Sequence, residues 1–266
     1  MLLSRRGLLG AALAPALPRL ARAQDESTID LSRYELVFDE PFDKLDVSAW
    51  GPGTRWIAHT PWNGDFGDAR FADPVEGFPF TIANGILRIE ARKGTDGKWR
   101  SGLLASVDRN GNGFAQRYGY FETRAKLPAG PGLWSAFWLI GRTNPSYTAE
   151  IDIIEHYGQF PERFTSSVHV WNRVDKTKSR SVNSRIPVPS GSLYTDFHTY
   201  GASVDPEWVR IYLDRKEVWR TPKPPEFDAP MYPIVDLNLG AGWPIDQAPS
   251  PSFMEVDYVR AWKPKA

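Results

Sequence analysis

The sequence predicts an all-β protein built from two packed antiparallel sheets, a β-sandwich or jelly roll. Short runs rich in Val, Ile, Tyr, Phe, Trp and Thr alternate with turn residues along most of the 266-residue chain. The 23 Pro and 22 Gly are scattered rather than clustered, which suits loops between strands. No segment of about 12 or more residues keeps a helical period. Together these three observations favour two layers of sheet around one core.

Within the predicted strands, side chains alternate between two faces. In the run 120–127 the charged residues fall on one face, and Phe121, Ala125 and Leu127 fall on the other. Gly, Pro, Asn and Asp bound the runs and place turns between them. The predicted strands span residues 35–38, 86–91, 103–107, 118–127, 133–140, 151–156, 166–171, 199–204, 209–213, 217–220, 234–239 and 253–262.

Composition excludes some classes of function. The 32 Lys and Arg balance the 32 Asp and Glu, whereas a protein that binds nucleic acid usually shows a basic excess, so we expect no nucleic-acid partner. The absence of Cys excludes disulfides and zinc-thiolate sites. The length suits one domain, predicted over residues 34–266 after a short polar link at 24–33, and we expect a monomer.

Residues 1–23 have the pattern of a cleavable signal peptide. Arg5 and Arg6 form a basic start, a short apolar middle follows, and the segment ends in Ala-Arg-Ala. The apolar stretch is about ten residues long, about half of what spans a bilayer. No second apolar run appears in the sequence, so we expect no membrane association after cleavage. The paired arginines resemble the twin-arginine export signal; a general secretory signal is the alternative. The sequence therefore predicts export, to the periplasm or beyond.

The most informative segment, residues 150–155, reads Glu-Ile-Asp-Ile-Ile-Glu. Because side chains alternate along a strand, Glu150 and Asp152 share one face. Strict alternation would turn Glu155 into the apolar face, where an unpaired carboxylate costs several kcal/mol. A β-bulge at residues 153–154 would shift the register by one residue and return Glu155 to the acidic face. We therefore predict three carboxylates on one face of a bulged strand.

Three such carboxylates suit retaining glycosidic cleavage. One carboxylate attacks the anomeric carbon, and a second protonates the leaving oxygen and then activates water. The two groups must titrate differently, and crowding acids beside apolar neighbours separates their pKa values. A third acid between them can help to set that difference. The alternative is a solvated polar face with ordinary acids.

Several motifs, in the right order, resemble glycoside hydrolase family 16 in its bulged E-x-D-x-x-E branch. That branch includes laminarinase-like members and endo-β-glycanases of succinoglycan-type exopolysaccharides. Residues 132–139 resemble the family's G-x-W-P-A-F-W-L strand, with Ser135 in place of Pro. Residues 197–200 resemble F-H-x-Y, and residues 256–262 resemble V-D-Y-V-R-V-W. The resemblance covers most of residues 34–263.

This resemblance implies a curved, concanavalin-like jelly roll with a substrate cleft on its concave sheet, and no cofactor for catalysis. Glu150 would be the nucleophile, Glu155 the general acid/base and Asp152 the assisting acid. The expected function is endo-acting, retaining hydrolysis of a β-1,3/1,4-linked glucan or a related bacterial exopolysaccharide by double displacement. A transglycosylase and a non-catalytic carbohydrate-binding protein on the same fold are the alternatives.

Most candidate substrate-binding residues are aromatic, because flat rings stack on the apolar faces of sugars. Trp134 and Trp138 lie four apart on one predicted strand and so face the same way. Trp134 suits the cleft, whereas core packing is the favoured interpretation of Trp138. His169 matches a strand beside the catalytic one, where the family often places a His near the acids; a structural His is the alternative. The other candidates are Trp62 and Asn63 in the loop 60–68, and Trp243 at the expected cleft rim.

Two further features bear on the fold rather than on the reaction. Many family members hold one structural calcium through main-chain oxygens and an Asp in the last strand. Asp257 matches that Asp, and Gly85 could match a carbonyl donor; calcium prefers such oxygen ligands. At the predicted hairpin 213–217 the family usually has Asp-Gly, and this chain has Asp214 and Arg215, which weakens the turn prediction.

Overall fold

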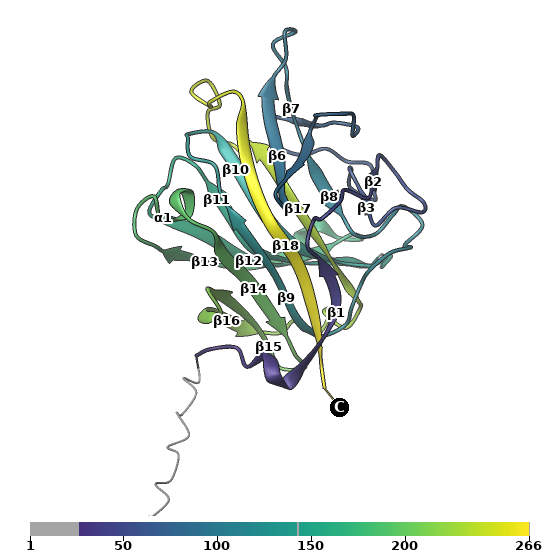
Figure 1. The fold of residues 1–266 in the computed structure, drawn as a ribbon. Helices are drawn as coiled ribbons and strands as arrows, with labels where there is room; N and C mark the ends of the chain where they lie inside the picture. Colours follow the sequence, from purple (N-terminus) through teal and green to yellow (C-terminus); the bar gives the residue numbers. More distant parts are fainter. Residues whose placement is uncertain (1–26, 143, 266) are drawn as a thin grey trace, which may run out of the picture.

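The computed structural model describes residues 27–142 and 144–265; the predicted signal peptide lies outside these residues. Within them the protein is almost entirely β, as predicted, and two large sheets pack against each other (Figure 1). No helix of this part is long and apolar enough to cross a membrane. Within residues 27–142 and 144–265 the only helical elements are the 3-10 turns η1 (Leu31–Arg33) and η2 (Lys176–Lys178) and the short α1 (Ser192–Thr195).

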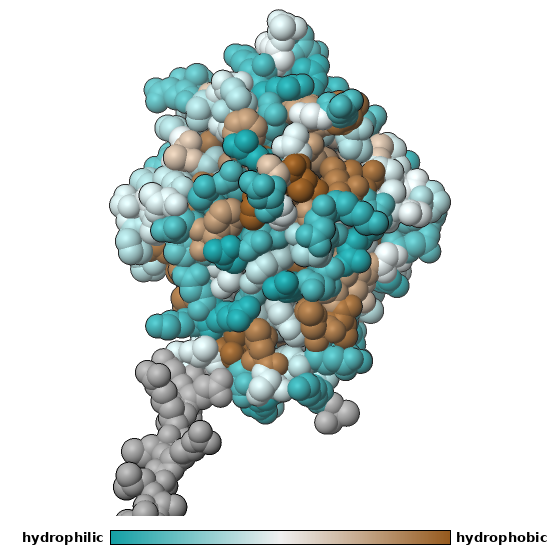
Figure 2. Space-filling model, viewed as in Figure 1, coloured by the Kyte–Doolittle hydropathy of each residue, from teal (hydrophilic) through white to brown (hydrophobic). Residues whose placement is uncertain are grey.

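One sheet has ten strands, of which eight form a continuous path and two are side branches. The path runs β16 (Lys216–Pro222), β15 (Trp208–Leu213), β14 (His198–Val204), β9 (Gly119–Lys126), β18 (Ser252–Pro264), β6 (Ile86–Lys93), β7 (Trp99–Ser101) and β4 (Arg70–Phe71). The branches are β1 (Tyr34–Glu40) on β18 and β5 (Phe80–Ala83) on β6. The long β18 pairs with three neighbours and crosses the middle of Figure 1 in yellow. Figure 2, in the same view, shows a mainly hydrophilic surface with separate hydrophobic patches.

The second sheet has eight strands and carries the carboxylate segment. In spatial order they are β13 (Arg180–Pro187), β12 (Arg163–Asn172), β11 (Tyr147–Tyr157), β10 (Leu133–Gly141), β17 (Met231–Leu239), β8 (Leu103–Ala105), β3 (Trp56–Ile57) and β2 (Val47–Ser48). Pairing is antiparallel in both sheets, as predicted, except for the two-residue matches β2–β3 and β4–β7, which are parallel.

The main hydrophobic core lies between the two sheets, and it decides which way β11 faces. Ile151 and Ile153 are fully buried in this core, together with Val256 of the opposite sheet. A second, smaller cluster that includes Trp138 and Ile234 packs on the other side of the eight-stranded sheet. The residues of β11 that alternate with the buried isoleucines therefore face this outer side.

The described part of the predicted link, residues 27–33, packs on the domain instead of running free. The backbone N–H of Ile29 donates to the carbonyl of Arg215 at 3.0 Å, and that of Glu217 donates to the carbonyl of Ser27 at 2.7 Å. These bonds add the segment to the edge at β16. The folded unit thus begins before residue 34.

Candidate active site

The predicted bulge is present on β11. Opposite β10, Ile154 pairs with Phe137 and Asp152 pairs with Trp138, so Ile153 is the extra residue. The ladder with β12 shifts at the same place, between Asp152 and Glu155. Ile153 and Ile154 both pack in the core between the sheets, which returns Glu155 to the side of Asp152.

Glu150, Asp152 and Glu155 line one hollow of about 400 Å³ on the outer face of the eight-stranded sheet. A larger hollow, of about 680 Å³, lies against the N-terminal segment, but Arg210 there pairs with Asp205 and Glu217. Asp205 and Glu217 are therefore ordinary ion-pair partners. The 400 Å³ hollow, which holds the three carboxylates, is therefore the candidate active site. Its other lining residues are Phe66, Trp134, Ala136, Trp138, Tyr157, His169, Trp171 and Ala241.

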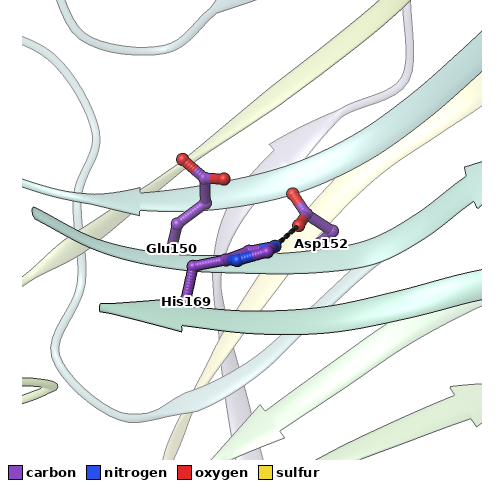
Figure 3. Close-up of side chains that lie close together, drawn as sticks. All are labelled: Glu150, Asp152 and His169. Atoms are coloured by element: carbon purple, nitrogen blue, oxygen red, sulfur yellow. Dashed lines mark ion pairs between the residues drawn. The ribbon is translucent and has the colours of Figure 1, made fainter. Parts of the chain in front are cut away.

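His169 joins the acids from the neighbouring strand, as its sequence match suggested. Its Nε2 lies 2.9 Å from Asp152 Oδ2 (Figure 3). Its Nδ1 bonds to Ser181 Oγ on β13. Trp171 stacks on the imidazole with ring centroids 4.7 Å apart. These contacts hold the ring against Asp152, with Glu150 close by. Glu150, Asp152 and His169 each offer a possible metal-ligand atom, and these atoms lie within 4.8 Å of one another. Among the described residues they form the only such group of three or more His, Cys, Asp or Glu side chains.

The three acids all hold protons more tightly than free carboxyl groups. Burial raises the pKa of Glu150 to about 8, and the charge of Asp152 adds to the effect. Burial also raises the pKa of Asp152 well above its usual range, with Glu155 and Asp236 as further causes. For Glu155, burial raises the pKa and a hydrogen bond from Tyr157, at 2.8 Å, opposes it. Neutral pH therefore leaves at least one proton in the hollow for acid catalysis.

Asp236 is a fourth buried acid of the site, and the sequence did not single it out. Its Oδ1 accepts a hydrogen bond from Trp138 Nε1 at 2.8 Å, whereas its Oδ2 is buried without a partner. On β17 it pairs with Ala136, which pairs on its other side with Glu155. Across the three strands, only the methyl group of Ala136 stands between Asp236 and Glu155. Burial raises the pKa of Asp236 to about 8.

The two tryptophans of β10 both line the hollow. Trp134 is half-buried and stacks on Tyr157 with ring centroids 5.9 Å apart and planes 15° apart, which places it in the cleft as expected. Trp138 is only 6% exposed, so the expectation of a packed side chain holds. It packs on the outer face and not between the sheets, and thereby forms the wall of the site.

The remaining candidates lie outside this central hollow. Trp62 is 46% exposed, lies 6.1 Å from the Trp138 ring and lines two adjoining hollows. Trp243 lines a third adjoining hollow, which shares Glu155 with the central one. Asn63 lines none of these hollows: it is a turn residue with φ of +57°, and its N–H bonds to the carbonyl of Thr60. The structure therefore does not bring Asn63 into the site.

The residues expected to bind calcium do not fit that ion. Asp257 lies in β18, where Arg124 Nη1 approaches its Oδ2 to 2.5 Å. The one carboxylate of the expected donor set is thus already matched by a guanidinium, which would repel a divalent cation. Gly85 takes a positive φ of 72° in the turn between β5 and β6, a turn role that accounts for a glycine there.

Several lining residues were not among the sequence candidates. Tyr157 and Trp171 follow Glu155 and His169 by two positions, so strand alternation could have identified both. Phe66 comes from the loop 60–68 and packs edge-on against the tryptophans of β10. Its role, like that of Ala241, depends on how distant loops fold over the sheet.

A family model described as the GH16 domain of β-porphyranases A–D matches residues 39–264. The chain belongs to glycoside hydrolase family 16. The motif resemblance and the jelly-roll prediction are thereby confirmed. The catalytic domain of an endo-1,3-β-glucanase (laminarinase) from Thermotoga petrophila RKU-1 superimposes with a TM-score of 0.67 at 25% identity, covering 88% of this chain and 99% of that one.

Two proteins of Rhizobium meliloti (strain 1021) are similar in sequence to this family 16 chain. The endo-1,3-1,4-β-glycanase EglC is 30% identical over 259 residues, which cover 88% of this chain and 53% of EglC. The endo-1,3-1,4-β-glycanase ExsH is 34% identical over 195 residues, which cover 69% of this chain and 39% of ExsH. The chain thus spans about half or less of the length of these relatives.

Proposed function

We propose that this family 16 protein is an endo-acting, retaining glycoside hydrolase of a β-1,3/1,4-linked glucan or a related bacterial exopolysaccharide. The observation that carries the proposal is the bulged β11, which gathers Glu150, Asp152 and Glu155 in one aromatic-lined hollow. Hollows adjoin it on both sides, as binding within a long chain requires. The relatives, two endo-1,3-1,4-β-glycanases and a laminarinase, support the same substrate class.

The proposed reaction proceeds in two displacements. Glu155 protonates the leaving glycosidic oxygen while Glu150 attacks the anomeric carbon, and a covalent glycosyl-enzyme forms. Glu155, now ionised, takes a proton from water, which attacks the same carbon and releases Glu150. Tyr157 orients Glu155 through its 2.8 Å hydrogen bond. Asp152, held by His169, lies between the two and assists through its own proton and charge.

The assignment of Glu150 as nucleophile rests on the motif, because burial raises the pKa values of both glutamates. With a pKa raised by burial to about 8, Glu150 is mostly protonated at neutral pH, whereas a nucleophile must be ionised. The charges of Asp152 and His169 act on Glu150 in opposite directions, so proton positions on these neighbours change its ionisation. A chemical test of the roles is therefore needed.

Azide distinguishes the two assignments by the stereochemistry of its product. We expect Glu150→Ala and Glu155→Ala each to lose activity by on the order of 10⁴-fold or more. With an activated aryl β-glycoside, azide should replace the missing nucleophile of Glu150→Ala and give the α-glycosyl azide. In Glu155→Ala, azide should attack the glycosyl-enzyme and give the β-glycosyl azide. The opposite pair of products would exchange the roles, and near-normal activity of Glu150→Ala would refute the site.

The substrate is tested by a hydrolysis panel of laminarin, lichenan, agarose, κ-carrageenan and bacterial exopolysaccharides. We expect a rapid fall in viscosity of a β-1,3/1,4-linked substrate, as internal cleavage produces, and a first product that keeps the β configuration by NMR. An inverted first product contradicts the mechanism. Longer products on addition of acceptor oligosaccharides would favour transglycosylation, and binding without cleavage would favour a carbohydrate-binding protein.

We also propose that the chain is exported by the twin-arginine route, on the strength of Arg5, Arg6 and the apolar segment that follows. Cell fractionation should find the mature protein outside the cytoplasm. Arg5→Lys combined with Arg6→Lys should leave the precursor inside. Unimpaired export of that variant would indicate the general secretory route instead.

A further inference from the structure

Beyond Glu150, the central hollow adjoins a second hollow, with which it shares Trp171, and this second hollow shares residues with a third. Their volumes are about 350 Å³ and about 550 Å³, and both are lined by Trp62, Ile140, Thr148 and Arg173. Trp171 links the larger of the two to the central hollow. We call the four cationic residues that line this pair of hollows the basic wing: Arg109, Arg142, Arg173 and Lys176.

The cations of the basic wing have no acidic partner among the described residues. Arg142 and Arg173 reach only backbone carbonyls, those of Gly113 at 3.5 Å and Asn144 at 3.2 Å. Arg109 lies over an aromatic ring, 4.1 Å from its centroid. All three arginines are exposed, and several other exposed arginines of the described part do pair with a carboxylate. The wing therefore offers unused guanidinium donors.

One acid, Asp108, lines the wing, but its charge is used within its own loop. Its carboxylate accepts hydrogen bonds from the backbone N–H groups of Asn110 and Asn112 and from the Asn112 side chain. Burial opposes ionisation, yet these bonds outweigh it and lower the pKa of Asp108. Four cations against one satisfied anion leave the wing positive, although the whole chain has a formal charge of zero.

A positive wing with aromatic rings matches an acidic sugar unit. Trp62 and Trp171 are 46% and 41% exposed and offer flat faces to a sugar ring. Guanidinium groups bind carboxylates and sulfate esters with paired hydrogen bonds, which neutral hydroxyl groups do not match in strength. A neutral glucan would leave the four cations without any charged partner.

We propose that the basic wing is a binding site for an acidic substituent, a carboxylate or a sulfate ester, carried by the substrate on the Glu150 side of the cleaved bond. The substrate class is then an acidic β-linked polysaccharide. This inference rests on the proposed function for the placement of the polysaccharide along the hollows, and it names the chemistry that selects the substrate.

The test measures binding separately from turnover, with Glu150→Gln as the binding protein. Two matched pairs of polysaccharides serve as probes. One is a carboxylated bacterial β-1,3/1,4-exopolysaccharide before and after removal of its acidic groups by mild acid and alkali. The other is a sulfated agar-type galactan before and after desulfation. We expect one acidic form to bind about tenfold more tightly than its stripped form at about 50 mM salt, with the ratio shrinking at about 500 mM. The pair that shows it identifies the anion.

Variants then locate the effect. Adding Arg142→Gln and Arg173→Gln should bring the ratio of affinities close to one. Arg70→Gln is the matched control, because it removes an exposed arginine that lines none of these hollows and has no ion pair in the described part. Thermal unfolding of each variant checks that the fold is intact. In Glu150→Gln without wing substitutions, the dependence of the affinity ratio on salt shows whether the preference is electrostatic.

The proposal would be overturned by equal binding of the acidic and stripped forms of both pairs, by a preference that persists without Arg142 and Arg173, or by an equal loss in Arg70→Gln. Tight binding of polygalacturonate, an acidic α-linked polymer, at the affinity of the acidic β-linked probe would mean a general polyanion surface and also overturn it. Failure of the proposed function would give a different result. The unsubstituted enzyme would then cleave no member of the hydrolysis panel, whatever Glu150→Gln binds.

Discussion

Asp236 is held in the folded protein with one carboxylate oxygen satisfied by Trp138 and the other buried without a partner. Burial raises its pKa from 3.8 to about 8. Between those values the folded protein keeps a proton there that the unfolded chain releases. Because the folded state binds more protons, the free energy of unfolding falls as pH rises from about 4 to about 8.

Asp236→Asn should remove this penalty while keeping an acceptor for the Trp138 N–H. We expect its free energy of unfolding, relative to the parent, to increase by at least about 1 kcal/mol between pH 5 and pH 8. Urea unfolding at the two pH values measures this difference. Asp246→Asn, at an exposed site, is the control and should show no such change. A difference for Asp236→Asn that is the same at both pH values would contradict the argument.

For single residues, the sequence predicted the three acids of β11 better than it predicted the site residues that come from other strands and loops. The bulge before Glu155 was predictable because the cost of burying a lone carboxylate applies within a single strand. The partnership of Asp236 with Trp138 depends on the register between β17 and β10, strands far apart in the chain. No local pattern encodes that register. Asn63 was misplaced for a similar reason, since the loop fold decides which of its side chains faces the site.

Among the elements, the strands that bury one face were the predictable ones. All twelve predicted strands overlap observed strands of the two sheets. β13 was missed because it is an exposed edge strand in which Ile186 is the only buried residue, so no apolar alternation marks it. The short β2, β3, β4, β5 and β7 were missed because two to four residues are too few to form a pattern.

The hairpin between β15 and β16 has Asp-Arg where Asp-Gly is usual, and a contact outside the turn accounts for the arginine. Asp214 and Arg215 both have positive φ, 50° and 64°, where a glycine at the second position would be less strained. Arg215 donates two hydrogen bonds of 3.0 Å to the carboxylate of Glu122. Glu122 is fully buried, and Tyr120 and Tyr258 also donate to it. The arginine thus compensates a buried charge at the expense of backbone strain.

Arg215→Gly separates these two effects. Relief of left-handed strain should gain about 1 kcal/mol. Removing the cation from a buried carboxylate should cost about 3 kcal/mol, the lower end of the usual range because Arg215 is 40% exposed on its side chain. We expect a net loss of roughly 2 kcal/mol in urea unfolding. Adding Glu122→Gln should recover part of the loss, and a single variant more stable than the parent would show that strain dominates.

For the whole molecule, the carboxyl groups whose pKa values are raised by burial lie together on one face of the sandwich. Burial raises the pKa values of Glu150, Asp152, Glu155 and Asp236, so each binds a proton in the folded state that the unfolded chain releases. His156 acts oppositely: burial lowers its pKa to about 4, so its contribution to stability grows as pH rises toward about 6.5. The carboxyl groups outnumber it. Stability should therefore decline above about pH 5 and more steeply above about pH 6.5.

The buried carboxyl groups proposed to act in catalysis also lower the stability of the folded protein at neutral pH. Glu150→Gln tests this connection between stability and function. The variant removes one of the buried ionisable groups, so its Tm should exceed that of the parent at pH 8 by about 2–4 °C for each kcal/mol gained. At pH 5, where Glu150 is protonated in the folded protein, the two Tm values should be closer. Thermal unfolding from pH 5 to pH 8 measures both curves. A parent Tm that rises over this range, or a variant less stable at pH 8, would mean that ionised carboxylates of the cleft are stabilised by contacts other than those described.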